Sequence, residues 1–235
     1  MNNMAIDWKR DSQSFDTVAE LYEAYRPGYP ESLVEQILTT TGIPKRGRIL
    51  EIGSGTGKAT ALFAQRGYSI LCIEPGKHLA RIARQKLVAF RKVKFQITTF
   101  EDWEDDGNLF DLVISAQAFH WVTQEIRCQK TAHILKPLRH LAIFWNHYLP
   151  LETSLHQKLN QVYQQYAPEL AAGKPTPHKD IQYWINELTA NEYFDLVEVI
   201  RFPWRENYST HHYLGLLNTY SDHLRLPKER RQQLF

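Results

Sequence analysis

The chain has 235 residues, of which 43% are hydrophobic and 23% charged, and its formal net charge is +2. This composition is typical of a globular protein and argues against a disordered or low-complexity chain. So small a net charge gives no indication of a polyanionic partner. The length suffices for one well-packed domain with a small appended cap.

The cysteines and the apolar runs of the sequence argue against disulfide-rich, zinc-binding, secreted and membrane-spanning proteins. Cys72 and Cys128 are far apart and lack paired spacing, so the sequence predicts neither a disulfide framework nor a zinc-thiolate site. His211, His212 and His223 also lack metal-ligand spacing, and we expect no metal. The N-terminus has no secretory apolar core, and no run approaches the roughly 20 apolar residues of a membrane span. We expect a cytoplasmic protein without a membrane partner.

Short apolar runs alternate with amphipathic segments between residues 47 and 146. Four of the runs are nearly continuously apolar, as strands buried on both faces are, whereas the third is more mixed and is expected near a sheet edge. Strand and helix in repetition predict an α/β, doubly wound, mostly parallel sheet. The predicted strands are residues 48–52, 69–73, 93–97, 112–115 and 141–145.

The segments on either side of this unit follow other patterns. A helix is expected at residues 31–40, before the first strand. After the fifth strand we expect a helical cap, then a strand, then C-terminal helices. The chain is interpreted as one domain, 1–235, with a cofactor-binding core at 15–146, a cap at 150–192 and the tail of the sheet with the last helices at 193–235. The individual predictions are helices at 151–170 and 181–191, a loop at 173–177, a strand at 197–202 and helices from 210 onward.

A glycine-rich turn, EIGSGTGKA at residues 51–59, stands where the first strand ends and a helix begins. Its three alternate glycines allow a tight turn and a close approach of a ligand to the backbone. A phosphate-binding loop would need glycine at Ile52 and Ser or Thr at Ala59, and a dinucleotide fingerprint would need glycine at Lys58. Neither pattern fits the turn.

S-adenosylmethionine is the third candidate, and it carries a sulfonium, an ammonium and a ribose but no phosphate. Glu51, at the end of the first strand, suits its positive methionine end and would repel a pyrophosphate. Glu74 follows the second strand, where a carboxylate accepts hydrogen bonds from ribose hydroxyls. An NAD-dependent oxidoreductase, a catalytically idle cofactor-binding module and a turn without a ligand remain as alternatives.

At these residues the sequence resembles the class I methyltransferase superfamily. Residues 51–57 resemble its first motif, 73–75 its second, 100–103 the stretch after the third strand and 110–121 the fourth-strand motif. Together with YRPGYP at 25–30, the last stretch looks like the small-molecule subgroup that includes trans-aconitate methyltransferases.

The resemblance implies a Rossmann-like fold, S-adenosyl-L-methionine as cofactor and a small-molecule acceptor. It implies that Phe100 and Glu101 hold the adenine edge, and that Ala116 and Gln117 line the floor beside the sulfonium. Tyr25 and Arg26 are expected to close over the cofactor, Arg26 pairing with an anionic group or forming a surface ion pair. The expected cofactor-binding residues are Tyr25, Arg26, Glu51, Gly53, Ser54, Gly55, Gly57, Glu74, Pro75, Phe100, Glu101, Ala116 and Gln117.

Two departures from the family pattern are visible. LKPLRH at 135–140 stands where the family usually has Leu-Lys-Pro-Gly-Gly, at the amino end of the fifth strand and away from the ligand. The family's last hairpin strand should follow a helix like 227–234, and the sequence ends at Phe235. The resemblance therefore predicts a sheet without that strand and with an unpaired edge.

His120, just beyond the fourth strand, is the candidate general base, although a structural histidine fits the pattern as well. A carboxylate acceptor needs no base, whereas a hydroxyl or amine usually does. SAQA at 115–118 replaces the Asn/Asp-Pro-Pro-Tyr/Phe stretch of enzymes that methylate adenine or cytosine nitrogens, so a nucleic-acid acceptor is disfavoured. We predict methyl transfer to a carboxylate or hydroxyl oxygen of a small molecule, and leave the oligomeric state open.

Overall fold

The computed structural model describes residues 14–148, 154–171, 180–196 and 198–235. Its sheet has five parallel strands in the order β3-β2-β1-β4-β5. The strands are β1 (Arg48–Ile52), β2 (Ser69–Ile73), β3 (Val93–Gln96), β4 (Phe110–Ala116) and β5 (Leu135–Phe144). The strand order reverses direction at β1, whose neighbours are β2 and β4, and such a switch point is where open α/β sheets bind ligands.

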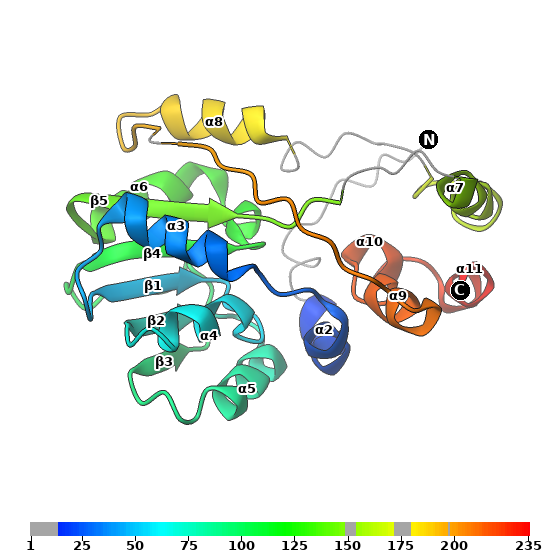
Figure 1. Ribbon diagram of the computed structural model, residues 1–235, viewed down its shortest axis with the longest axis horizontal. Helices are drawn as coiled ribbons and strands as arrows, with labels where there is room; N and C mark the ends of the chain where they lie inside the picture. Colours follow the sequence, from blue (N-terminus) through cyan, green and yellow to red (C-terminus); the bar gives the residue numbers. More distant parts are fainter. Residues whose placement is uncertain (1–13, 149–153, 172–179, 197) are drawn as a thin grey trace.

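Helices cover both faces of the sheet (Figure 1). Successive side chains of a strand point to opposite faces. Ile49 therefore packs with α3 (Glu31–Thr41) and α4 (Lys58–Ala64), whereas Leu50 packs on the side of α6 (Gln124–Ile134) and α8 (Ile181–Thr189). The helices before and within the sheet are η1 (Phe15–Val18), α2 (Ala19–Tyr25), α3 (Glu31–Thr41), α4 (Lys58–Ala64), α5 (Lys77–Lys86), η2 (Phe119–Trp121) and α6 (Gln124–Ile134). The doubly wound α/β fold predicted from the sequence is thereby confirmed.

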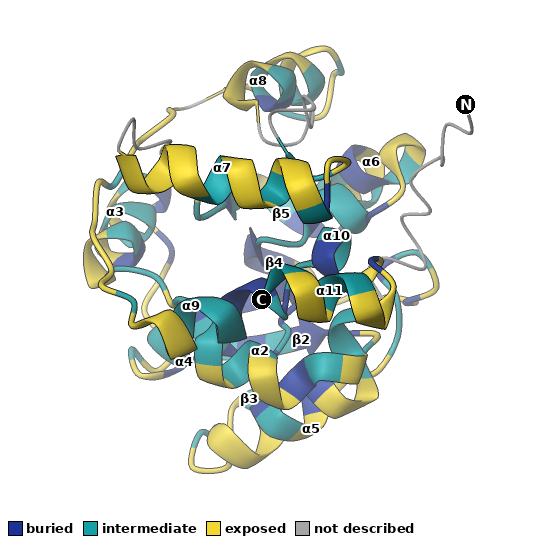
Figure 2. Cartoon of the chain, turned by 90° about the vertical axis from the view of Figure 1, so that its right-hand side faces the viewer, coloured by how far each residue is buried: buried dark blue, intermediate teal, exposed yellow. Residues whose placement is uncertain are grey.

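The remaining helices are α7 (Ser154–Tyr166), α8 (Ile181–Thr189), α9 (Thr210–Leu217), α10 (Ser221–Leu224) and α11 (Lys228–Leu234). Seen from the side to which the strands point, α2, α7, α9 and α11 lie around the carboxyl ends of the strands (Figure 2). The segments that are neither strand nor sheet-covering helix thus gather where a parallel sheet binds its ligand. No described helix has both the length and the apolar character needed to cross a membrane.

The predicted strand at 197–202 is wrong for the residues that the structure describes. Val197 lies outside them, and residues 198–202 form no strand. Glu198 instead accepts hydrogen bonds from Gln36 (3.2 Å) and Thr40 on α3. Among the described residues, this segment thus contacts α3 and does not pair with β5. The predicted loop at 173–177 also lies outside the described residues.

The fifth strand is longer than predicted, because residues 135–140 belong to it. The register with β4 shifts between Phe110 and Leu112, which marks an irregularity at the amino end of β5. Leu138, where the family pattern has glycine, adopts a left-handed φ of 57° and is 97% exposed. The strained turn therefore lies at the opposite end of the sheet from the glycine-rich turn, as expected.

Candidate cofactor site

The glycine-rich turn connects β1 to α4 at the switch point of the sheet. Gly53, Gly55 and Gly57 have φ values of 69°, 55° and 73°, a left-handed conformation that side chains rarely adopt. The Gly53 N–H donates to the Ile73 carbonyl at 2.8 Å, which fixes the turn against the end of β2. A Cβ on Gly53 would lie 2.3 Å from the Cβ of Ala118. The turns after β1 and β4 are therefore in direct contact, and only glycine fits at position 53.

Glu51 lies beneath this turn and is almost completely buried. Its Oε2 accepts a hydrogen bond of 2.6 Å from the Thr60 hydroxyl on α4. Burial raises the pKa of Glu51 to about 8, and the nearby Glu74 contributes to the rise, although the Thr60 hydrogen bond opposes it. The carboxylate is thus at the predicted strand tip, and its role toward a methionine group stays a prediction.

Glu74 extends from the end of β2 toward the turn. Its Oε2 accepts from the Gly55 N–H at 2.7 Å and its Oε1 from the Gly76 N–H at 2.8 Å. Burial raises its pKa to about 7, although these two backbone hydrogen bonds favour the ionised form. The structure therefore joins the second acidic residue directly to the middle glycine of the turn, two features that the sequence only placed on neighbouring strands. Ser54 is buried in the same turn and Pro75 is exposed beside Glu74.

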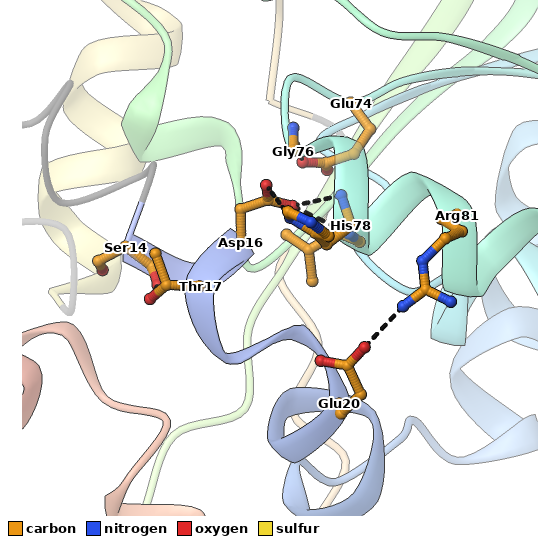
Figure 3. A network of polar contacts seen from close by, with 9 residues as sticks. Ser14, Asp16, Thr17, Glu20, Glu74, Gly76, His78 and Arg81 are labelled. Atoms are coloured by element: carbon orange, nitrogen blue, oxygen red, sulfur yellow. Dashed lines mark hydrogen bonds and ion pairs between the residues drawn. The ribbon is translucent and has the colours of Figure 1, made fainter.

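Asp16 on η1 shares this corner, which the sequence did not indicate. Its Oδ1 accepts from the backbone N–H groups of His78 (2.7 Å) and Leu79 (3.0 Å), and its Oδ2 lies 2.9 Å from His78 Nδ1. Figure 3 shows Asp16 beside His78 at the start of α5, with Gly76 and Glu74 close by. Burial alone would raise the pKa of Asp16, but the hydrogen bonds from Leu79 and His78 lower it below its usual value.

Phe100 and Glu101, expected at the adenine, lie after β3. Phe100 is buried in the cluster that contains Ile52 and Ile73, and its ring stacks on Trp103 with the centroids 6.0 Å apart. Glu101 Oε1 accepts from both the backbone N–H and the hydroxyl of Thr123, at 2.8 Å each, where α6 begins. Both residues thus have structural partners, and their contact with adenine stays a prediction.

The end of β4 brings together Ala116, Gln117 and His120. Gln117 has a left-handed φ of 61° and donates its N–H to the Phe144 carbonyl at 3.0 Å, so the chain turns sharply there. The Nδ1 of His120 accepts from the Trp145 indole N–H at 3.3 Å. The imidazole thus has a structural partner after β5, and a role of His120 as a base stays a prediction.

Tyr25 and Arg26 contact α9 and the residue Thr219 that follows it, and their role toward a cofactor stays a prediction. The Tyr25 hydroxyl is 2.9 Å from His211 Nε2. Arg26 donates from Nε to the Thr219 hydroxyl and from Nη2 to the Thr219 carbonyl, at 2.8 Å each. The guanidinium also lies over the Tyr220 ring, 4.2 Å from its centroid. In the described part of the chain no carboxylate forms an ion pair with Arg26, so the surface ion pair considered for it is not found there.

Tyr22 is a site residue that the sequence analysis missed. A Cβ on Gly55 would lie 3.9 Å from Tyr22 Cε1, so the tyrosine ring lies over the middle of the turn. Its place in YEAYRPGYP, one helical turn before Arg26, was the available signal. The structure also joins Asp222, His223 and Tyr163, a contact that the sequence did not indicate: His223 Nδ1 is 2.7 Å from Asp222 and Nε2 is 2.8 Å from the tyrosine hydroxyl.

A cavity of about 450 Å³ lies elsewhere, between α6 and α8, and contains none of the predicted site residues. Its lining includes Cys128, Tyr183 and Glu187. Among the described residues, no group of three or more His, Cys, Asp or Glu side chains is placed to hold a metal ion.

Comparison with known proteins agrees with this geometry. Residues 49–138 match the family described as methyltransferase domain. The matched segment is therefore similar to a methyltransferase domain. It contains the turn, Glu74 and the end of β4.

Several curated proteins are similar to the chain. An uncharacterized methyltransferase of Mycobacterium tuberculosis is 31% identical over 139 residues, which are 59% of this chain and 54% of that protein. An uncharacterized methyltransferase-like protein of Schizosaccharomyces pombe is 27% identical over 230 residues, covering 95% of this chain and 84% of that protein. A protein of Saccharomyces cerevisiae named as a probable S-adenosylmethionine-dependent methyltransferase is 32% identical over 149 residues, covering 62% and 50%. The chain spans about half the length of the first of these relatives.

Two solved structures share the fold over most of the chain. A protein named as a methyltransferase from an antibiotic biosynthesis pathway of Anabaena variabilis superposes with a TM-score of 0.66, covering 90% of this chain and 84% of that one at 19% identity. A protein of Anaeromyxobacter dehalogenans named as a type II methyltransferase gives a TM-score of 0.64, covering 90% and 87% at 20% identity. At these identities the likeness concerns the fold alone.

Proposed function

We propose that the chain binds S-adenosyl-L-methionine across the tips of β1 and β2 and transfers its methyl group to a small-molecule acceptor. The observation that carries this proposal is the Glu74 carboxylate, 2.7 Å from the Gly55 N–H at the switch point. A dinucleotide-binding turn directs its amides to a pyrophosphate, whereas here a carboxylate accepts one of them and Glu51 lies beneath. Two acids at the turn favour a ligand with positive charge and ribose hydroxyls.

Methyl transfer from a sulfonium is an in-line displacement, so the chain's own residues act mainly by positioning and by excluding water. Glu74 would hold the ribose, Phe100 and Glu101 the adenine edge, and Ala116 and Gln117 the sulfonium side. The acceptor would approach from the side of α2 and α9, because the strand tips close the other side. A carboxylate or hydroxyl oxygen is the first choice of acceptor, with His120 as the base for a hydroxyl. We also propose that the chain is a single domain with a helical cap and that it belongs to the trans-aconitate-like subgroup.

Titration calorimetry with S-adenosylmethionine, S-adenosylhomocysteine and NAD tests the cofactor. We expect the first two to bind, and Glu74→Ala to weaken binding by about 1–3 kcal/mol, the range for losing hydrogen bonds to a charged group. Glu104→Gln, at an exposed acid outside the site, is the matched control and should leave the affinity unchanged. Binding of NAD alone would refute the proposal in favour of an oxidoreductase.

Turnover with tritium-labelled methyl groups tests the acceptor. A panel of small carboxylic acids and the corresponding alcohols is offered, and each product is treated with base. A methyl ester releases labelled methanol, whereas a methyl ether does not, so the assay separates the two oxygens. Tight cofactor binding without turnover on any acceptor would favour the idle binding module.

A further inference from the structure

Residues 14–25, which form η1 and α2, lie across the start of α5, and we call them the N-terminal cover. The cover is attached at its first turn by Asp16, whose carboxylate accepts two backbone N–H groups of α5 at 2.7 and 3.0 Å. The N-cap of α5, Gly76, has no side chain to satisfy these donors. A residue from about 60 positions earlier in the chain thus supplies the cap that the helix lacks locally.

The attachment point coincides with the proposed ribose site. A Cβ on Gly76 would lie 2.8 Å from Asp16 Oδ1 and 2.9 Å from Glu74 Oε1, so the two carboxylates flank the same glycine. The charge of Asp16 also contributes to the raised pKa of Glu74. A movement of the cover therefore changes the surroundings of the Glu74 carboxylate. A ligand bound to Glu74 would also lie close to Asp16.

The cover also carries the group that lies over the turn. Tyr22, on α2, is the residue nearest to the Cβ position of Gly55, at 3.9 Å. Two ion pairs align α2 with α5, Glu20 with Arg81 at 2.6 Å and Glu23 with Lys86 at 2.8 Å. The side chains of the first pair are 70% and 49% exposed, against 22% for Asp16. The exposed Glu20–Arg81 pair contributes little. The Glu23–Lys86 pair is only 29% and 32% exposed and adds to the hydrogen bonds by which Asp16 holds the first turn of the cover (Figure 3).

We propose that Asp16 is a positioning residue for the cofactor: it fastens the N-terminal cover across the tip of β2, and the cofactor enters and leaves only when this attachment opens. The proposal rests on the proposed function, because it concerns the same site. In this proposal the N-terminal cover, and not the strand tips alone, sets the rates at which the cofactor binds and leaves. Tyr22 closes the turn only while Asp16 holds the start of α5.

The test measures association and release of S-adenosylhomocysteine with the full chain, using labelled ligand and an unlabelled chase. In Asp16→Ala we expect both rate constants to rise about tenfold, which corresponds to about 1.4 kcal/mol in the opening equilibrium. Asp16→Asn, which retains an oxygen acceptor without the charge, should fall between Asp16→Ala and the unaltered protein. Glu20→Gln, on the same cover but in an exposed pair, should change neither rate by more than about twofold.

A merely structural role for Asp16 predicts a different pattern. A damaged site would release ligand faster but bind it no faster, and this result would overturn the proposal, as would unchanged rates in Asp16→Ala. Hydrogen exchange of residues 14–25 in the ligand-free protein tests the attachment independently, with faster exchange expected in Asp16→Ala and not in Glu20→Gln. If the unaltered chain binds no S-adenosylhomocysteine, the proposed function fails, whatever the exchange result.

Discussion

Replacing Gly53 by alanine tests the contact between the turns after β1 and β4. The added Cβ would lie 2.3 Å from the Cβ of Ala118, whereas the optimal separation of two carbon atoms is about 3.5–4.0 Å. One of the two turns must therefore move. Overpacking of this kind typically costs about 1–3 kcal/mol, and a left-handed conformation adds about 1–2 kcal/mol for a residue with a side chain. We expect Gly53→Ala to lower the free energy of unfolding by about 2–5 kcal/mol.

Gly67→Ala is the matched control, because Gly67 also has a left-handed φ of 85° but a Cβ there would meet nothing within 4 Å. It should show the conformational cost alone. Urea unfolding of both variants, with a check that the m-value is unchanged, gives the difference. A second substitution, Ala118→Gly, removes the clashing atom and should restore part of the stability of Gly53→Ala. If Gly53→Ala and Gly67→Ala are equally destabilised, or Ala118→Gly restores nothing, the packing argument is wrong.

Three further predictions concern polar side chains. The folded-state pKa of Glu51 is raised from 4.5 to about 8, so its contribution to stability is full below pH about 4.5 and is lost as the pH rises toward 8. Glu51→Gln should be more stable than the unaltered protein at pH 8, by on the order of 1–4 kcal/mol. Denaturant unfolding at pH 5 and pH 8 measures this difference. An equal loss of stability in the two proteins between pH 5 and pH 8 would contradict the prediction. Arg127 forms a buried ion pair with Glu187 and donates to the Tyr183 hydroxyl at 2.9 Å, so Arg127→Ala should cost about 3–5 kcal/mol, because it leaves a buried charge unpaired. The double variant Arg127→Met with Glu187→Leu should recover most of that loss, and a double variant as unstable as the single one would refute the argument. His120→Ala should lower kcat by about 10²–10⁴-fold for a hydroxyl acceptor and leave a carboxylate acceptor unaffected; normal turnover of an alcohol would remove the base role.

The half of the fold that contains the sheet was predictable because its signals are local. Each buried strand is a short apolar run, and the turn after β1 must use glycine where the chain is left-handed and in contact with Ala118. The closeness of the acids at positions 51 and 74 was also predictable, because the carboxyl ends of neighbouring parallel strands lie together. Periodicity and spacing within about 25 residues were enough for these features.

Contacts between distant segments were not predictable in this way. Arg26 has its hydrogen-bond partner 193 positions later, and no local pattern in either segment indicates the other. The stretch at 197–202 has the composition of a strand, yet described residues 198–202 form none, because Glu198 is held by α3. Asp16 resembled any exposed acid before a helix, until the structure brought it to the start of α5.

The raised pKa values of Glu51 and Glu74 also separate the competing cofactors. Without a ligand, burial holds these carboxyls at pKa values of about 8 and about 7, so both are partly protonated near neutral pH. A cationic ligand favours the ionised forms and lowers both values, and its binding must then release protons. An anionic dinucleotide raises the values and takes protons up.

Calorimetry at pH 7 in two buffers of different ionisation enthalpy gives the number of protons exchanged and its sign. For S-adenosylmethionine we expect net release, and an affinity that rises with pH to about 8 and then levels off. Glu51→Gln, which cannot titrate, should release fewer protons. Proton uptake, or an affinity that falls over this range, would mean that the two acids do not face a cation, and the charge argument for the cofactor would fail with it.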